Sequence, residues 1–357
     1  MSIATTPFTP NTPENMEKAR IAEAKARQEL DMAFRRACAE NDVGQAKDLL
    51  ARGANPKAPH GTAPGGHGCL SSAIGQGSLD AAKWLLELDS ELAVNGCGGA
   101  LPMTVAAYAG NTEAIDLLAP FAPVIGLDRG HTPLMFAAGR SHLLAAQKIF
   151  ELGGLPAVRE IYAAGPHTPL TWALAERASL DMIAWLLPLS DLAWTPEPQS
   201  ARVSGNRFGQ TGPALAVAAF SVARAGSPRS VTAQQQAFDL VWAACNGAQR
   251  AAATSWAQGL TPQTAAEAAE KLGALDCLLA NQPAERRVEE VERALANSFD
   301  GVDVQSAMPR AWVVYHANNE ARDLRVAADE GRARAFSPSG GAGHNPSALM
   351  AAVASRL

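Results

Sequence analysis

Hydrophobic positions along this chain recur in short blocks whose spacing favours helices over strands. Within the blocks, small apolar pairs alternate with leucine pairs, and apolar residues three to four positions apart predict the buried stripe of an amphipathic helix. The pattern therefore predicts two short helices in each block, the first lined by alanine and the second by leucine. The clearest pairs are Ala106/Ala107, Ala137/Ala138, Leu85/Leu86, Leu117/Leu118 and Leu186/Leu187.

Four of these blocks align on one motif. They begin at His67, Ala100, His131 and His167. The position before the proline or its equivalent falls at Gly68, Leu101, Thr132 and Thr168, which gives steps of 33, 31 and 36 residues. Thr-Pro begins a helix well, because threonine caps exposed N–H groups and proline in the first turn loses no hydrogen bond. A weaker copy precedes them at Met32, and looser copies follow near Gly212 and from Leu260.

A period of about 33 residues with Thr-Pro-Leu, Ala-Ala, a polar turn, Leu-Leu and a glycine resembles the ankyrin repeat. The resemblance covers roughly residues 30–280 and is clearest at Thr132–Leu134 and Thr168–Leu170. It implies an all-α solenoid of about six to seven helix-turn-helix units, with short β-turn fingers between units and helical caps. Each unit then buries its two apolar sides by stacking on its neighbours.

The residue after Thr-Pro-Leu departs from the family. Ankyrin repeats usually have histidine there, whereas this chain has Ser71, Thr104, Met135 and Thr171. The departure removes a hydrogen-bond network between units, so we expect a less rigid array.

The composition changes along the chain and predicts its organisation. We expect a disordered N-terminus at 1–13, an N-terminal helix or cap at 14–31, a repeat array at 32–282 with an insertion at about 188–212, a C-terminal helical cap at 283–335, and a flexible tail with a short terminal helix at 336–357.

Composition and charge narrow the class of protein. With 357 residues and 47% hydrophobic content the chain has enough apolar surface for a core, and a net charge of −5 argues against a nucleic-acid partner. Five cysteines without paired spacing indicate reduced thiols, and no apolar stretch is long enough for a membrane span. We therefore expect a cytoplasmic monomer. Because the chain begins with a Ser/Thr/Pro-rich segment and no Sec signal, export by a non-Sec route is the alternative.

The sequence offers little catalytic or metal-binding chemistry. His60, His67 and Cys69, with Cys97 one repeat away, match no closed zinc site, so we expect no metal and no cofactor. Cys245 or Cys277 with His316 remains a possible thiol–histidine pair, although both cysteines lie in apolar helical contexts that predict buried, inert thiols. Trp84, Trp172 and Trp185 fall on packing positions and are expected in the core.

The resemblance also indicates where a partner would bind. In the ankyrin family, contacts come from the exposed ends of the first helices and from the fingers. The matching helix-end residues are Gln76, Tyr108, Arg140 and Glu176, and the matching finger residues are Arg129, His131 and His167. Tyrosine and arginine are favoured interface anchors, so Tyr108 and Arg140 rank first. The alternative is that these are ordinary solvated residues. For the histidines, local bonding or solvation competes with a partner-contacting, pH-sensitive edge.

Three functions follow as expectations. The leading one is a non-catalytic scaffold that binds a partner protein through the concave face and finger tips of the array. The second is a secreted bacterial effector whose repeats act on a host protein. The third is an enzyme with an active site in residues 190–357, to which the repeats recruit substrate.

Overall fold

The computed structural model describes residues 13–58, 67–97, 99–126, 128, 131–159, 167–194, 208–225 and 228–280. Within them the chain forms fourteen α-helices and two short 3-10 helices, without a named strand. The chain divides into two compact units, Met1–Val124 and Ile125–Leu357. The expected disordered start, most of the insertion, the C-terminal cap and the tail fall outside the described residues.

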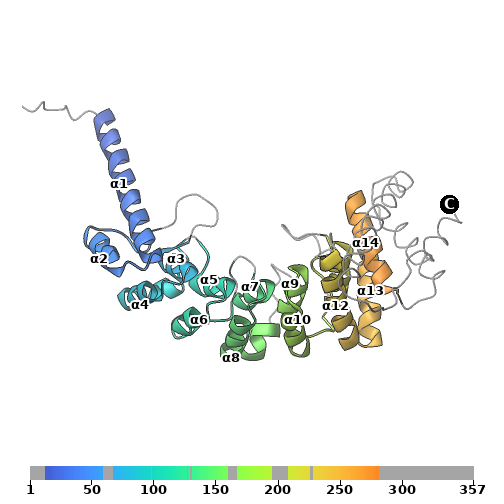
Figure 1. Cartoon of the computed structure of the whole chain (residues 1–357). Coiled ribbons are helices and arrows are strands. Elements are labelled where there is room, and N and C mark those ends of the chain that lie inside the picture. The colour runs from blue at the N-terminus through green and yellow to red at the C-terminus, as the bar shows by residue number, and fades with distance from the viewer. Residues whose placement is uncertain are drawn as a thin grey trace, which may run out of the picture. The chain divides into compact units, whose positions relative to one another are not determined.

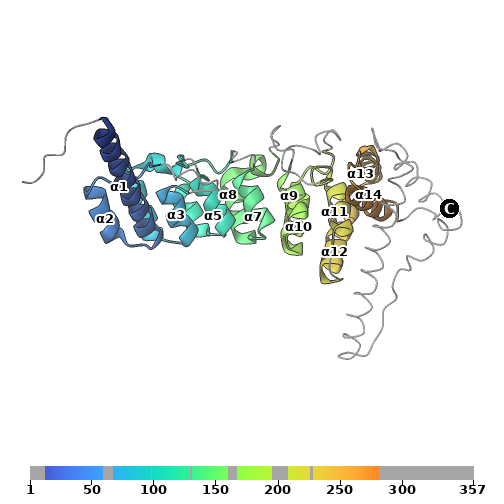
Figure 2. The ribbon, with the colours of Figure 1, turned by 90° about the horizontal axis from the view of Figure 1, so that it is seen from above.

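Unit 1 consists of three helix pairs. The first helices α1, α3 and α5 pack side by side, and α2, α4 and α6 each pack on the first helix of their own pair (Figure 1 and Figure 2). This is the helix-turn-helix stacking that the repeat pattern predicts. The bounds are α1 (Pro13–Ala39), α2 (Val43–Ala51), α3 (Cys69–Gln76), α4 (Leu79–Leu88), η1 (Ser90–Ala93), α5 (Pro102–Ala109) and α6 (Thr112–Leu118).

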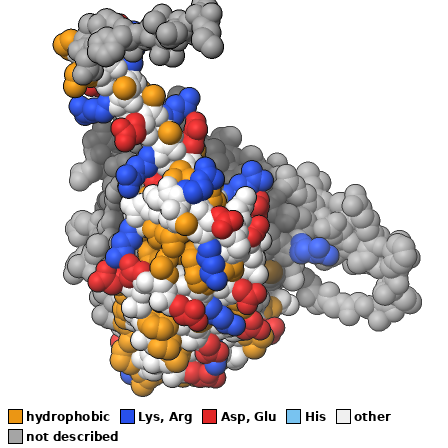
Figure 3. Space-filling view, turned by 90° about the vertical axis from the view of Figure 1, so that its left-hand side faces the viewer, with side chains coloured by type: hydrophobic (Ala, Val, Ile, Leu, Met, Phe, Trp, Pro, Cys, Tyr) orange, Lys and Arg blue, Asp and Glu red, His pale blue; other side chains and the backbone are white. Residues whose placement is uncertain are grey.

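Helix α1 is continuous across the boundary expected between an N-terminal cap and the first repeat. Its only buried residues are Phe34, Ala37 and Cys38, all in the last two turns. Most of the rest is exposed, and charged side chains of both signs line it in Figure 3. Lys18 and Glu14 form a 2.7 Å ion pair one turn apart, which supports the helix where packing does not.

Unit 2 continues the same pairing and then departs from it. Helix α7 packs on α9 and α9 on α11, while α8, α10 and α12 act as second helices; α13 and α14 both pack against α11. The bounds are α7 (Pro133–Gly139), α8 (Leu143–Arg159), α9 (Pro169–Ala175), α10 (Leu180–Leu186), η2 (Leu187–Leu189), α11 (Ala214–Ala223), α12 (Pro228–Ala244), α13 (Gly247–Gly259) and α14 (Ala265–Leu278).

The last expected repeat copy does not form a two-helix repeat. The segment from Leu260 that aligns with a two-helix repeat instead contains one helix, α14, without an internal turn. Helix α11 is buried over nearly its whole length, from Ala214 to Val222. A helix surrounded in this way has no free face for a regular array to extend.

A left-handed residue ends the first helix of five successive pairs and turns the chain back. The next backbone N–H then reaches a carbonyl of the preceding turn, as from Ser78 to Ala73 at 2.8 Å and from His142 to Ala137 at 2.9 Å. Glycine adopts this conformation without a steric cost, and asparagine tolerates it. The five residues are Asn41, Gly77, Gly110, Ser141 and Arg177, with φ values of 61°, 76°, 70°, 62° and 61°.

The predicted helix starts are confirmed. The Thr132 hydroxyl accepts a hydrogen bond from the N–H of Met135 at 3.2 Å, and Thr168 forms a full capping box with Thr171. The expected β-turn finger is represented by an isolated bridge between Asp128 and His131. These devices fix the positions at which α7 and α9 begin.

Candidate functional site

The predicted helix-end residues lie at the surface. In unit 1, Gln76 is the exposed last residue of α3, and Tyr108, near the end of α5, is 46% exposed. In unit 2, Arg140 and Glu176 are exposed residues that cap the C-termini of α7 and α9. Among the predicted finger residues, His131 is half-buried, and Arg129 lies outside the described part of the chain.

The position of His167 requires a correction. Its side chain is 0% exposed and lies directly before the capping residue Thr168. A fully buried ring at the start of α9 cannot contact a partner from a finger tip. We therefore omit His167 from the partner-binding residues and treat it as part of the packing beneath them.

Four rings come together in unit 2 and form an aromatic cluster, made of His131, Phe136, His167 and Trp172. The His131 and Trp172 ring centroids are 4.1 Å apart, and His131 lies 5.5 Å from Phe136. His167 packs edge-on against Trp172 at 5.1 Å and stacks with His131 at 6.2 Å. The expectation that Trp84, Trp172 and Trp185 lie in the core is wrong, because each of the three is only partly buried.

Gly139 explains why this indole lies across α7. A Cβ atom on Gly139 would come within 2.7 Å of Trp172 Nε1 and 3.2 Å of Glu176 Cγ. Trp172 and Glu176 are one helical turn apart on α9, so both side chains lie above the same glycine. Because Gly139 has no side chain, the Trp172 indole and the Glu176 side chain can both pack against it.

Sequence reasoning missed Phe136 and Trp172 as surface residues, although a signal was present. Each stands four positions before a predicted contact residue, Arg140 and Glu176 respectively. Residues separated by four positions share a helix face, so helix geometry would have placed both aromatic residues on the predicted surface.

The charges near the aromatic cluster differ in their surroundings. Arg140 already takes part in an interaction within the molecule, and Arg177 donates a 3.2 Å hydrogen bond to the carbonyl of Arg224. The carboxylate of Glu176, by contrast, has no hydrogen bond or ion pair among the described residues. Among the described residues, the surface beside Trp172 therefore presents a carboxylate without a charged partner.

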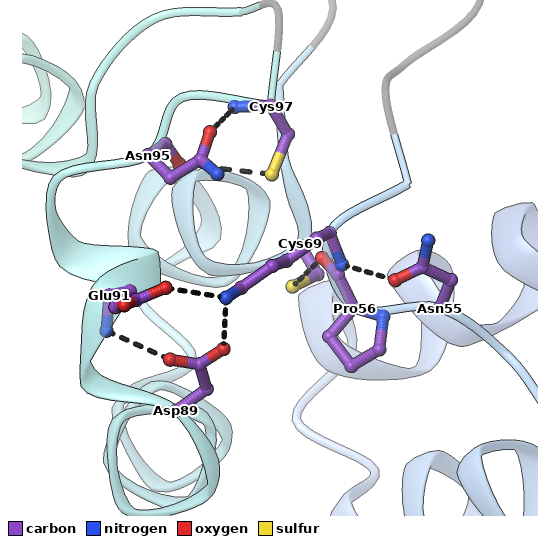
Figure 4. Close-up of polar contacts among 8 residues, drawn as sticks. Asn55, Pro56, Cys69, Asp89, Glu91, Asn95 and Cys97 are labelled. Atoms are coloured by element: carbon purple, nitrogen blue, oxygen red, sulfur yellow. Dashed lines mark hydrogen bonds and ion pairs between the residues drawn. The ribbon is translucent and has the colours of Figure 1, made fainter.

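Three cysteines of unit 1 have buried thiols, and two of them, Cys69 and Cys97, belong to the metal-ligand candidate considered from the sequence. Cys69 Sγ donates to the carbonyl of Pro56 at 3.1 Å (Figure 4). Burial raises the pKa of the Cys38 thiol to about 12 and also raises the pKa values of Cys69 and Cys97. These thiols are thus protonated and poorly nucleophilic at neutral pH. The described residues contain no group of three or more metal-binding side chains, and His60 lies outside them.

A neighbouring ion-pair network connects two repeats of unit 1. Lys57 Nζ lies 2.7 Å from a carboxylate oxygen of Asp89 and 2.7 Å from one of Glu91, and Figure 4 shows both carboxylates at the start of η1. Its hydrogen bonds to both carboxylates raise the pKa of Lys57, and the hydrogen bond from Lys57 lowers the pKa of Asp89. The network joins the segment after α2 to the following repeat and has the character of a structural contact.

The C-terminal third contains a buried lysine that the sequence did not reveal. Lys271 on α14 is 0% exposed, and its Nζ donates to the carbonyls of Gln258 and Leu260 at 2.8 and 2.7 Å. These carbonyls end α13, where helices lack internal donors. Burial lowers the pKa of Lys271 to about 7. The contact joins α14 to α13 and accounts for the lysine structurally.

The alternative of a thiol–histidine pair cannot be assembled from the described residues. Cys245 is buried, and this burial raises the pKa of its thiol. Cys277 is half-buried, while His316 lies outside the described part of the chain. The cysteines alone provide no catalytic arrangement.

Comparisons with known proteins bear on the family. No helix among the described residues is both long and apolar enough to span a bilayer. The sequence matched no curated protein. A family model for ankyrin repeats (3 copies) matches residues 70–159, the segment from α3 through α8. Together with the stacked helix pairs and the capped Thr-Pro helix starts, this match identifies residues 70–159 as ankyrin repeats.

Proposed function

We propose that this protein is a non-catalytic scaffold that binds a partner protein through the exposed ends of its first helices. Ankyrin repeats indicate a protein-interaction role. The observation that carries the proposal is the difference in exposure between the middle and the end of each first helix. Small alanines such as Ala107 and Ala138 are fully buried, whereas the helix ends carry exposed and chemically varied residues such as Tyr108 and Arg140.

The chemistry of these ends suits an interface. Tyrosine, tryptophan and arginine provide a disproportionate share of binding energy in protein complexes. Tyr108 is 46% exposed in unit 1, and the partly buried Trp172 joins Arg140 in unit 2. We include Gln76, His131, Phe136 and Glu176 in the proposed surface because they flank these anchors. Five free cysteines fit a reducing compartment such as the cytoplasm.

Crosslinking followed by affinity capture and mass spectrometry tests the proposal. Wild-type protein is compared with Tyr108→Ala and Arg140→Ala, and Glu113→Ala on the exposed side of the second helix α6 is the control. We expect one protein that wild type and the control capture and that both surface variants lose, at unchanged thermal midpoints. Equal capture by all four proteins would refute the assigned surface.

A further inference from the structure

We propose that unit 2 binds a cationic side chain of the partner, arginine or lysine, on the surface formed by His131, Trp172 and Glu176. This inference rests on the proposed scaffold function and adds the chemistry of the contact. Three features carry it: a fixed aromatic ring, an adjacent uncompensated carboxylate, and the disposition of the neighbouring positive charges.

The aromatic ring is held from several sides and remains partly accessible. His131 packs against the Trp172 indole at 4.1 Å and His167 meets it edge-on at 5.1 Å. Gly139 leaves the space in which Nε1 lies, because any Cβ there would approach it to 2.7 Å. An indole fixed in this way can bind a ligand through its exposed part without the entropy cost of ordering the ring on binding.

The carboxylate adds a charge of the right sign. Glu176 lies one turn after Trp172 on α9, is exposed, and has no ion pair or hydrogen bond among the described residues. A guanidinium or ammonium group over the indole would gain cation–π attraction and a salt bridge together. Arginine gains most, since its planar group stacks on the ring while its N–H groups reach the carboxylate.

The surrounding positive charges do not remove this preference. Arg140 is already engaged within the molecule, and Arg177 is directed to the Arg224 carbonyl of the next repeat. A purely apolar partner side chain would cover Glu176 and desolvate its carboxylate without compensation. An acidic side chain would add like-charge repulsion. The surface therefore selects a cation over both alternatives.

A peptide titration of the full chain tests the inference. The probes are acetyl-Gly-Gly-Arg-Gly-Gly-amide and matched peptides with lysine, norleucine or glutamate in place of arginine. Binding is followed by the ¹⁵N-indole signal of Trp172, which the loss of one peak in Trp172→Phe assigns. We expect the arginine peptide to shift this signal at concentrations about fivefold below those of the norleucine peptide, the scale of one cation–π contact.

Two charge variants separate the carboxylate from general electrostatics. Glu176→Gln should weaken the arginine peptide about threefold or more, whereas Asp181→Asn, which removes one exposed negative charge from α10 of the same repeat, should not. Thermal midpoints check that both variants are folded. Equal shifts by the norleucine peptide, preference for the glutamate peptide, no shift with arginine, or an unaffected Glu176→Gln would each overturn the inference.

The peptide result and the capture experiment can fail independently. Partner capture that depends on Tyr108 and Arg140, without an arginine-peptide shift, would uphold the scaffold function and reject cation recognition. A Glu176-dependent peptide shift without any variant-sensitive capture would reject the assigned scaffold surface and uphold the cation contact.

Discussion

The side-chain carbonyl oxygen of Asn41 accepts a 2.9 Å hydrogen bond from the backbone N–H of Ala81, which lies in the next repeat. The amide nitrogen of Asn41 also donates to Asp80 at 3.2 Å. Unit 2 repeats the device, because the Ser141 hydroxyl oxygen accepts a 2.8 Å hydrogen bond from the N–H of Ser179. Both residues are left-handed, so the conformation that reverses the chain also aims a polar side chain at the neighbouring helix start.

This relationship predicts different effects for two substitutions of Asn41. Asn41→Gly keeps the left-handed turn and loses the side-chain hydrogen bonds with Ala81 and Asp80, which should lower the free energy of unfolding by about 1 kcal/mol. Asn41→Ala loses the same hydrogen bonds and must also hold a residue with a Cβ atom in the left-handed conformation. This should lower the free energy of unfolding by roughly 1 kcal/mol more. Urea unfolding of the three proteins measures both differences. A glycine variant as stable as wild type would show that the inter-repeat bond contributes nothing.

The packing of the Trp172 indole on Gly139 leads to a second prediction. In Gly139→Ala the new methyl group would meet Nε1 at 2.7 Å and Cδ1 at 3.0 Å of the indole, which is closer than real Cβ contacts allow. Glycine to alanine favours the helix itself, so we expect near-wild-type stability with a displaced indole. The Trp172 ¹⁵N-indole signal should move, and partner capture should weaken.

Gly75→Ala provides the matched control for this substitution. Gly75 holds the corresponding place in unit 1, before Gln76, where a Cβ would approach only the Val105 side chain, at 3.2 Å. This variant should leave the Trp172 signal unchanged. If the Trp172 indole signal did not move in Gly139→Ala, the ring would accommodate the added methyl group. Gly139 would then not determine the position of the indole.

The repeat register was predictable where a capping residue and a proline mark the start of a helix. Thr-Pro marks the helix starts at Thr132 and Thr168, and the structure confirms both caps. Within the second helices the pattern was less decisive, because a pair of adjacent leucines does not say whether one or both face the core; Leu85 and Leu86 are both buried. Leu118 is 0% exposed, whereas Leu117 is only half-buried. The sequence expectation counted both leucines in the buried stripe, and only the packing around α6 distinguishes them.

This difference predicts unequal costs for two alanine substitutions. Leu118→Ala removes a fully buried side chain and leaves a cavity, which should cost about 2–5 kcal/mol. Leu117→Ala should cost clearly less, because water already reaches part of that side chain and can fill the space. Urea midpoints of the two variants measure the difference. Equal losses would contradict the burial of α6 that the structure shows.

The surface and the C-terminal region were harder to predict for physical reasons. Trp172 falls at a position that aromatic residues usually occupy in a core, and nothing in its own repeat marks that its indole packs over Gly139, which lies a full repeat earlier. Lys271 is of a type that is rarely buried. Its hydrogen-bond acceptors, the carbonyls of Gln258 and Leu260, are backbone atoms, and no residue pattern marks them.

Lys271 makes the stability of unit 2 depend on pH in a defined direction. Burial lowers the pKa of its amine from 10.5 to about 7 in the folded state, while the unfolded chain keeps the ordinary value. Between these two values the unfolded state binds more protons than the folded state, so stability rises as pH increases from about 7 to 10.5. Below this window both states are protonated, and the cost of the buried charge is present in full.

Lys271→Met should remove this dependence. Methionine fills a similar volume without a titratable group, although it leaves the carbonyls of Gln258 and Leu260 without this donor. The free energy of unfolding, measured in urea from below neutral to mildly alkaline pH, should therefore rise more steeply for wild type than for the variant, by at most about 1.4 kcal/mol per pH unit. Lys83→Met, at an exposed position, should parallel wild type. Parallel curves for Lys271→Met and wild type would show instead that Lys271 stays charged in the folded protein, with the amine solvated despite its position between α13 and α14.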